Sequence, residues 1–394
     1  MHIAARLLGD VVQGARIGCN GFLTRSRAHS FCFFVCEPMR LSAEQLQEYQ
    51  AAGFVVLDTM VPVGLLEPLR AAAARATARA RAGGWAHGIR TAASPFPPYD
   101  QDATADVWAV HLLVHPDMGE PAFLDWYGSD EVRSACAQLL GLQGGDRVAA
   151  TQPGACPAQQ LQLQLVNMLI NPERVAFGLP WHRDLVAASA TDAEELTVLC
   201  GGYGSDGGAE PAGGAGAAVQ WNTALYEDAC LRAVPGSHRR VRTAAERAAT
   251  TTALAGPGGM AWLPGEAVVR LRAGQTVVYD PNLLHRADYD PAARRATLHC
   301  SMGYGEAGAA NLAHVLGRGR MGWVQRGGAF EQSLAGRAPG IRALYEQLLV
   351  SLEKAEAAGL LAGTDDGDVR MQAYRGVAEG EGGGGGGGGD DDDK

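Results

Sequence analysis

Between about residues 160 and 304 the chain alternates apolar and polar positions in short runs, which is typical of half-buried β-strands. The run Leu161–Asn171 begins with strict alternation of Leu and Gln, and Gln275–Asp280 is rich in β-branched residues and follows a Gly-containing turn. The segment Ala224–Val234 has an extended pattern with a turn in its middle. These runs predict an antiparallel β core.

Helical periodicity surrounds this core. Apolar residues recur at spacings of three and four in four segments, at about residues 42–52, 63–82, 130–141 and 338–358. We expect the last of these helices to pack on the outer face of the sheet. A β core with flanking helices predicts a mainly β fold, a double-stranded β-helix of the jelly-roll, cupin-like kind, whose open mouth can house a metal ion.

Composition divides the chain into three parts. Residues 41–360 are predicted to form a single domain, interrupted by a Gly-rich insertion at 201–218. Residues 1–40 form an N-terminal extension in which Arg outnumbers acidic residues, which suits either an organelle transit peptide or a disordered extension. Residues 361–394 form a disordered acidic and Gly-rich tail, and its end resembles an enterokinase-cleavage sequence.

Charge and cysteine content narrow the class of protein. The net charge of −10 argues against nucleic acid as the principal partner. No apolar run approaches the roughly 18 residues that a membrane-spanning helix requires. The eight Cys residues lack a Cys-x-x-Cys motif or regular spacing, which indicates free thiols. We therefore expect an intracellular protein, either cytoplasmic or organellar.

Three residues form a candidate metal site. His182 and Asp184 are two positions apart, so on a β-strand both side chains project from the same face. His285 lies about a hundred residues later and must come from a neighbouring strand. Two His and one carboxylate can hold Fe(II) on one triangular face and leave the opposite positions open for a cosubstrate and O2. Zinc also accepts this donor set.

The order of the surrounding motifs adds a family resemblance. His182-x-Asp184 is followed by Val-Pro-Gly-Ser-His at 234–238, a Gly-Gln turn at 274–275, His285 and an Arg about ten residues later. The segment Leu41–Leu57 and the helix expected after it also match. Over residues 41–304 this order resembles the phytanoyl-CoA dioxygenase-like family of Fe(II)/2-oxoglutarate oxygenases.

The resemblance implies residue roles. His182, Asp184 and His285 would bind the iron, and an Arg beyond His285 would pair with the far carboxylate of 2-oxoglutarate. Arg295 shares a strand face with Thr297 and His299 and is the favoured residue, with Arg294 as the alternative. Many members place this Arg eleven residues after the His, where this chain has Ala296.

Polar side chains on the strand at 161–171 are further candidates. Gln164 and Asn167 are candidates to bind 2-oxoglutarate or substrate, although a buried amide bonded to backbone is the default expectation. We expect His238 to make a hydrogen bond in its turn. We expect ordinary core or surface roles for four other histidines, His111, His115, His299 and His314.

The reaction implied by the resemblance is oxidation of a substrate C–H bond, coupled to conversion of 2-oxoglutarate and O2 into succinate and CO2. Relatives that transfer halogen carry a small residue in place of Asp184, so this chain is expected to hydroxylate its substrate or to carry out a related oxidation. The alternatives are a zinc-dependent hydrolase and a catalytically silent jelly-roll protein that binds a ligand.

Overall fold

The structure is a computed structural model, and it describes residues 39–91, 106–142, 160–200, 218–251 and 262–362. The predicted extension at 1–40, insertion at 201–218 and tail at 361–394 fall almost entirely outside these ranges, as does the side chain of His314.

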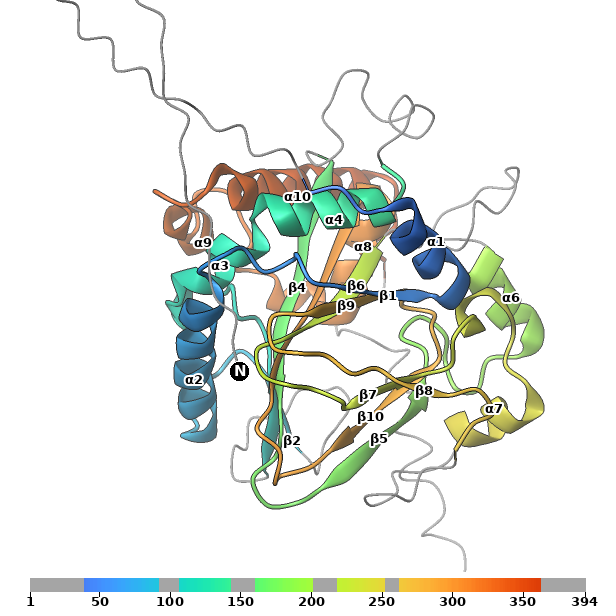
Figure 1. The fold of residues 1–394 in the computed structure, drawn as a ribbon. Helices are drawn as coiled ribbons and strands as arrows, with labels where there is room; N and C mark the ends of the chain where they lie inside the picture. The colour runs from blue at the N-terminus through green and yellow to red at the C-terminus, as the bar shows by residue number, and fades with distance from the viewer. Residues whose placement is uncertain (1–38, 92–105, 143–159, 201–217, 252–261, 363–394) are drawn as a thin grey trace, which may run out of the picture. The chain divides into compact units, whose positions relative to one another are not determined.

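Two antiparallel sheets form the centre of the described part of the chain (Figure 1). The larger sheet has the strand order β1-β9-β6-β11-β4-β3-β2, and the smaller has the order β5-β10-β7-β8. Their bounds are β1 Phe54–Leu57, β2 Ile89–Thr91, β3 Val107–Val110, β4 Leu161–Ile170, β5 Phe177–His182, β6 Ala218–Ala224, β7 Leu231–Ala233, β8 Ala267–Val268, β9 Thr276–Tyr279, β10 His285–Tyr289 and β11 Ala296–Tyr304.

From β4 to β11 the strands alternate between the sheets in the manner of a jelly roll, except that β7 and β8 are consecutive in the smaller sheet. β4, β6, β9 and β11 lie in the larger sheet, whereas β5, β7, β8 and β10 lie in the smaller one. This arrangement confirms the predicted double-stranded β-helix. The strands β1, β2 and β3 extend the larger sheet with segments that lie before the strand-rich region of the sequence.

Helices pack around these sheets, and all four predicted helices are present. α1 spans Ala43–Ala52, α2 Leu66–Arg81, α4 Asp130–Leu139 and α10 Pro339–Ala357. The prediction did not include α3 Pro121–Tyr127, α6 Asp192–Cys200, α7 Ala244–Thr250, α8 Gly305–Leu316 and α9 Ala329–Ser333, or the short 3-10 turns at Pro116–Met118, Ser237–Arg239 and Arg318–Arg320. Several of these are a few turns long, so their periodicity is weak.

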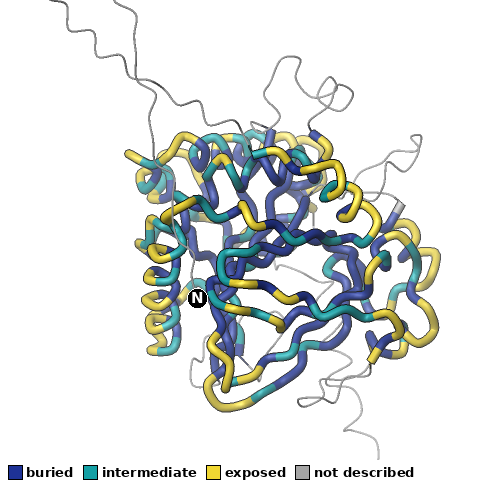
Figure 2. Tube along the Cα trace, in the orientation of Figure 1, coloured by how far each residue is buried: buried dark blue, intermediate teal, exposed yellow. Residues whose placement is uncertain are grey.

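The main apolar core lies between the helices and one face of the larger sheet. α10 packs on β4 as predicted, and its residues Leu344 and Leu348 are fully buried in the same cluster as Met168 of β4. Figure 2 shows buried backbone along the strands and exposed positions on the outer sides of the helices. The opposite face of the larger sheet turns toward the smaller sheet, and this second interface carries the polar residues discussed below.

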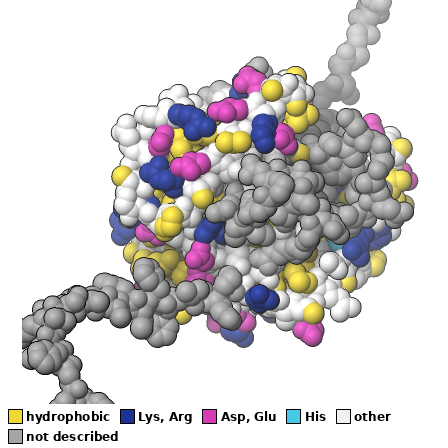
Figure 3. Space-filling model, turned by 90° about the horizontal axis from the view of Figure 1, so that it is seen from above, with side chains coloured by type: hydrophobic (Ala, Val, Ile, Leu, Met, Phe, Trp, Pro, Cys, Tyr) yellow, Lys and Arg dark blue, Asp and Glu magenta, His cyan; other side chains and the backbone are white. Residues whose placement is uncertain are grey.

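The described residues also show the state of three cysteines and the distribution of surface charge. None of the helices in the described ranges combines the length and apolar character needed to span a bilayer. Cys136, Cys230 and Cys300 are buried and unpaired. On the face seen in Figure 3, the described basic and acidic side chains are interspersed.

Candidate functional site

The three predicted metal ligands meet where β5 and β10 pair. His182 is the last residue of β5 and His285 the first of β10, and the two are direct partners in the antiparallel register. The neighbouring-strand prediction for His285 is therefore confirmed. The prediction that Asp184 lies on the same strand as His182 was wrong, because the strand ends at His182 and the Asp184 N–H donates to Pro281 O at 2.9 Å.

The ligand atoms nevertheless converge. His182 Nε2 lies 3.6 Å from one Asp184 oxygen, and His285 Nε2 lies 3.7 Å from the other. Each imidazole is oriented by its Nδ1, which lies 2.7 Å from Pro180 O in His182 and 2.8 Å from Leu283 O in His285. A carbonyl can only accept, so both Nδ1 atoms carry hydrogen and both Nε2 lone pairs are directed to the carboxylate side. This donor set suits a divalent ion with open coordination positions.

The surroundings of Asp184 and His182 favour the protonation states that metal binding requires, an ionised carboxylate and a neutral imidazole. Burial by itself raises the pKa of Asp184, but His285, His182 and a hydrogen bond from the Gln220 amide outweigh it, so the pKa is lowered. Burial, followed by the nearby His285, lowers the pKa of His182 to about 4. The structure therefore presents an ionised carboxylate beside a neutral imidazole at neutral pH.

A buried ionic cluster supports the loop that carries these ligands. Arg183, between the two ligands, has a fully buried side chain 3.2 Å from the equally buried Glu195 of α6. Its Nη2 also donates to Ser237 O at 2.9 Å and Arg240 O at 2.8 Å. Ser237 in turn accepts the Leu284 N–H through Oγ at 2.8 Å, so the Val-Pro-Gly-Ser-His segment supports both ligand-bearing loops.

The neighbouring His238 makes a hydrogen bond, although its partner is a carbonyl of α1 and not a group of its own turn. It lies outside the residues that line the cavity described next, and its Nε2 is 3.2 Å from Gln50 O at the end of α1.

The triad opens into a cavity of about 160 Å³ between the two sheets. Its apolar lining includes Leu165, Leu179, Leu185 and Val315. Its polar lining consists of Arg90, His111, Asn167, Gln220, Asn222, Tyr279, Tyr289, Arg295, His299, Ser301 and Asn311, in addition to the three ligands. A cavity in which apolar side chains and convergent polar groups meet is typical of a small-molecule site.

Arg295 is the favoured candidate of the two arginines, and the structure directs it into this cavity. Its Nε donates to Asp228 Oδ2 at 2.7 Å, and its guanidinium lies 4.9 Å from the centre of the Tyr289 ring. Burial by itself would lower the pKa of Arg295, but Asp228 outweighs it and the pKa is raised. Arg295 Nη1 is buried and has no acceptor among the described residues. A buried cation with an unused donor in the triad's cavity fits a ligand carboxylate.

The alternative residue Arg294 lies outside the cavity. It is exposed, it donates to the Tyr226 hydroxyl at 2.7 Å, and its guanidinium stacks on that ring at 3.9 Å. The two arginines directly precede β11, which begins at Ala296, and of the two only Arg295 lines the cavity.

Of the two candidate amides on β4, one lines the cavity and the other contacts α8. Asn167 lines the cavity, and its Oδ1 accepts the Leu112 N–H at 3.0 Å. Gln164 does not line it, because its Nε2 donates to Gly308 O of α8 at 3.0 Å and its Oε1 accepts from Ser301 at 3.2 Å. Positions three apart on a strand face opposite sides, so the candidate ligand-binding role was wrong for Gln164, which has the default role of a buried, bonded amide.

Sequence reasoning missed several cavity residues. His299 and His111, treated as ordinary core histidines, both line the cavity, as do Gln220 and Asn222 on β6. Burial lowers the pKa of His299 to about 4, and its Nδ1 lies 2.8 Å from Asn222 Oδ1. The alternation of Gln220 and Asn222 with apolar residues was a usable signal, since it places both amides on one strand face.

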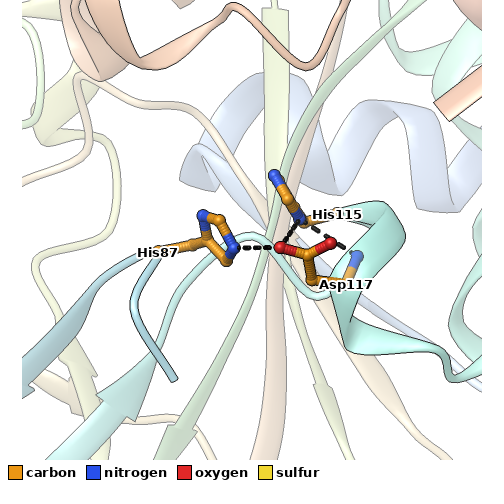
Figure 4. Close-up of side chains that lie close together, drawn as sticks. All are labelled: His87, His115 and Asp117. Atoms are coloured by element: carbon orange, nitrogen blue, oxygen red, sulfur yellow. Dashed lines mark hydrogen bonds and ion pairs between the residues drawn. The ribbon is translucent and has the colours of Figure 1, made fainter. Parts of the chain in front are cut away.

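A second group of potential ligands lies outside this cavity (Figure 4). His87 Nε2 is 2.7 Å from Asp117 Oδ2, and His115 Nδ1 is 3.7 Å from the same oxygen. The two imidazoles are stacked at 3.6 Å between centroids with an interplanar angle of 25°. Imidazole lone pairs lie in the ring plane, so stacked rings do not aim both at one ion. We therefore assign this group no metal.

No curated protein matches this chain in sequence. The solved structure of EctD from S. alaskensis with 2-oxoglutarate and 5-hydroxyectoine is 17% identical, with a TM-score of 0.43 over 67% of this chain and 76% of that one. EvdO2 from Micromonospora carbonacea var. aurantiaca complexed with 2-oxoglutarate is also 17% identical, with a TM-score of 0.40 over 68% and 92%.

A family match covers most of the described core. The phytanoyl-CoA dioxygenase (PhyH) family matches residues 49–289, which include all three residues of the triad. The match covers more than half of the chain and most of the predicted range of 41–304. This protein belongs to the phytanoyl-CoA dioxygenase family.

Proposed function

We propose that this protein is an Fe(II)- and 2-oxoglutarate-dependent dioxygenase that oxidises a C–H bond of a small organic substrate. The observation that carries the proposal is that one cavity contains both the His182–Asp184–His285 triad and the buried, incompletely paired Arg295. The triad suits either iron or zinc, whereas a buried cation for a second carboxylate is what 2-oxoglutarate requires.

The donor atoms fit the proposed groups. His182, Asp184 and His285 would hold Fe(II), which when bound supplies the activation of O2. Gln220 donates to Asp184 and so restrains the carboxylate rotation. The backbone carbonyls behind the two histidines keep their Nε2 atoms directed to the metal position.

Arg295 would bind the far carboxylate of 2-oxoglutarate. Asp228 accepts a hydrogen bond from Arg295 Nε. Asp228 also accepts hydrogen bonds from the Thr297 hydroxyl and the Cys230 N–H, which fix its position. The guanidinium is thereby oriented before the cosubstrate arrives, which lowers the cost of ordering it on binding. Asn167 lies in the same cavity and is retained as a candidate contact with cosubstrate or substrate.

The sequence supports the remaining parts of the proposal. Asp184 retains a carboxylate where halogen-transferring relatives have a small residue, so hydroxylation or a related oxidation is the proposed outcome. We retain residues 41–360 as one catalytic domain and an intracellular location as parts of the same proposal, the latter because Cys136, Cys230 and Cys300 are free thiols.

Anaerobic reconstitution tests the proposal directly. We expect the purified protein with Fe(II) and 2-oxoglutarate to develop the visible absorption of the Fe(II)–2-oxoglutarate complex, with one iron per chain. The variant in which His182, Asp184 and His285 are all replaced by Ala should show none. Substrates would then be sought by succinate release. Persistent absorption in the triple variant would show that the ligand assignment is wrong, and zinc binding without 2-oxoglutarate binding would support the hydrolase instead.

A further inference from the structure

The cavity contains two hydrogen-bond acceptors that have no donor among the described residues. One is Nε2 of His299 on β11, and the other is Oδ1 of Asn311 on α8. Both residues line the cavity, and both are only partly buried. An acceptor that is withdrawn from water without a donor costs free energy, so two of them in one cavity indicate a ligand that supplies the donors.

Asn222 fixes the tautomer of His299. The His299 Nδ1 lies 2.8 Å from Asn222 Oδ1, and an amide oxygen can only accept, so Nδ1 carries the hydrogen. The other polar contact of this imidazole, 3.5 Å from the Tyr279 hydroxyl, also involves Nδ1. Nε2 therefore keeps a free lone pair within the described part of the chain. Burial holds the pKa of His299 at about 4, which leaves the imidazole neutral at physiological pH.

Asn311 belongs to a helix that is attached to the strands beneath it. α8 begins directly after β11, and Gln164 of β4 donates to the Gly308 carbonyl of α8 at 3.0 Å. Asn311 and Val315 are one helical turn apart and both line the cavity, so this face of α8 forms part of the cavity wall. The Asn311 Oδ1 is itself buried, and no described residue donates to it.

His299 lies near the triad and away from Arg295. His299 pairs with Asn222 across β11 and β6, which makes Gln220 its diagonal neighbour, and Gln220 donates to Asp184. Diagonal neighbours in an antiparallel pair lie about 7 to 8 Å apart. Four residues of extended backbone, about 13 Å, separate His299 from Arg295. The acceptor on His299 is therefore distinct from the cation proposed for the far carboxylate of 2-oxoglutarate.

The chemistry of these acceptors selects neutral hydroxyl groups. A carboxylate or phosphate would place oxygen lone pairs against the lone pair of His299 Nε2. A substrate ammonium would meet the same burial that prevents protonation of this imidazole. A hydroxyl group donates a hydrogen bond without carrying charge, and two acceptors require two such donors.

We infer that His299 and Asn311 form a subsite for a substrate with two hydroxyl groups, one donating to His299 Nε2 and the other to Asn311 Oδ1. The inference rests on the proposed dioxygenase function of the same site. The carbon skeleton would lie against Leu165 and Val315, which line the same cavity. The two hydroxyl contacts would thus fix which carbon faces the triad, because remote contacts position a reacting centre.

Binding of matched probes to the protein loaded with Fe(II) and 2-oxoglutarate under anaerobic conditions tests the inference. The probes are short alkane diols with hydroxyls on carbons 1,2, 1,3 or 1,4, and the dimethyl ether of each, measured by ligand-observed NMR. The ethers keep the oxygen atoms but cannot donate. We expect one diol to bind more tightly than its ether, and its spacing would report the separation of the two acceptors.

His299→Leu and Asn311→Leu should each weaken binding of that diol about 3- to 10-fold, the scale of one neutral hydrogen bond, and leave ether binding nearly unchanged. His299→Gln should recover part of the loss, because the Gln side chain again offers an acceptor. His87→Leu is the matched control, since it removes a partly exposed imidazole outside the cavity and should leave binding of both probes unchanged.

The inference is overturned if no diol binds more tightly than its ether, or if either Leu variant keeps the wild-type preference for the diol. It is also overturned if His299→Leu and His299→Gln lose the Fe(II)–2-oxoglutarate absorption, because His299 would then serve the cosubstrate or the metal. Absence of that absorption in the wild type would instead refute the proposed function.

Discussion

Arg295 and Asp228 form a buried ion pair, with 2.7 Å between Nε and Oδ2 and side chains 5% and 6% exposed. The two residues are 67 positions apart in the chain, and they meet because β11 begins next to the turn that follows β6. The pair fixes the direction of the guanidinium and leaves the buried Nη1 available for a ligand. The pair therefore holds the guanidinium in one orientation, as the proposed carboxylate contact requires.

Replacing Arg295 by Ala should weaken 2-oxoglutarate binding by about 10- to 150-fold, the equivalent of a charge-assisted contact of roughly 1.5 to 3 kcal/mol. Fe(II) affinity should be nearly unchanged, since the triad remains intact. Anaerobic titration of the visible absorption measures both. Arg294→Ala is the control and should leave 2-oxoglutarate affinity nearly unchanged, because Arg294 is exposed and stacked on Tyr226. A loss of 2-oxoglutarate affinity only in the Arg294 variant would assign the carboxylate contact to Arg294 instead of Arg295.

Glu195→Gln should destabilise the protein strongly. Glu195 is fully buried among Arg183, Arg242 and Arg247, and removing one partner of a buried ionic cluster leaves uncompensated charge, at a cost of about 3 to 5 kcal/mol. Fe(II) affinity should also fall, because Arg183 lies between two ligands. Urea unfolding and metal titration measure the two effects.

The control for Glu195 is Glu356→Gln, which breaks the exposed pair with Arg318 and should cost less than about 1 kcal/mol. Equal losses in the two variants would contradict the role assigned to the buried cluster.

The buried Asp280 should make the free energy of unfolding depend on pH. Burial raises its pKa to about 7 from an ordinary value of 3.8, against the opposing effects of the Asn282 N–H and Arg183. Between these two values the folded state retains a proton that the unfolded state has lost, so stability falls as the pH rises through this window and levels off above it.

Asp280→Asn removes this titration. The free energy of unfolding of the variant minus that of the wild type should therefore grow from about pH 4 to pH 7, by at most about 1.4 kcal/mol per pH unit. Urea unfolding at a series of pH values measures this difference, in which the titration of other groups cancels. A difference independent of pH would show that Asp280 is ionised throughout.

Gly53→Ala should destabilise the junction between α1 and β1. Gly53 has a φ of 82°, and an added Cβ would lie 2.4 Å from Nδ1 of the buried His238. The left-handed backbone costs about 1 to 2 kcal/mol for a non-glycine residue, and the overlap adds about 1 to 3 kcal/mol.

Gly64→Ala isolates the first of these costs, because Gly64 has a φ of 87° with nothing within 4 Å of the added carbon. Thermal and urea unfolding of both variants give the comparison. Equal destabilisation would mean that His238 moves aside without cost.

The sequence by itself predicted the β core, four of the helices and the three residues of the candidate metal site. Alternation along Leu161–Ile170 and the β-branched run in Thr276–Tyr279 are local signals, and they identify strands without knowledge of their partners. The motif order around His182, Asp184 and His285 identified the family. The same local reasoning placed Asp184 on a strand, and it was wrong because strand ends depend on pairing with the next chain segment.

Only the tertiary structure decided which polar residues share the cavity. Arg295 lines the cavity and Arg294 is exposed outside it, and Gln164 donates to α8 while Asn167 lines the cavity. Arg90, His111 and His299 meet there because β2, β3 and β11 lie in one sheet, although they are far apart in sequence. Strand register and long-range pairing depend on packing across the whole core, and a local pattern of residues does not encode them.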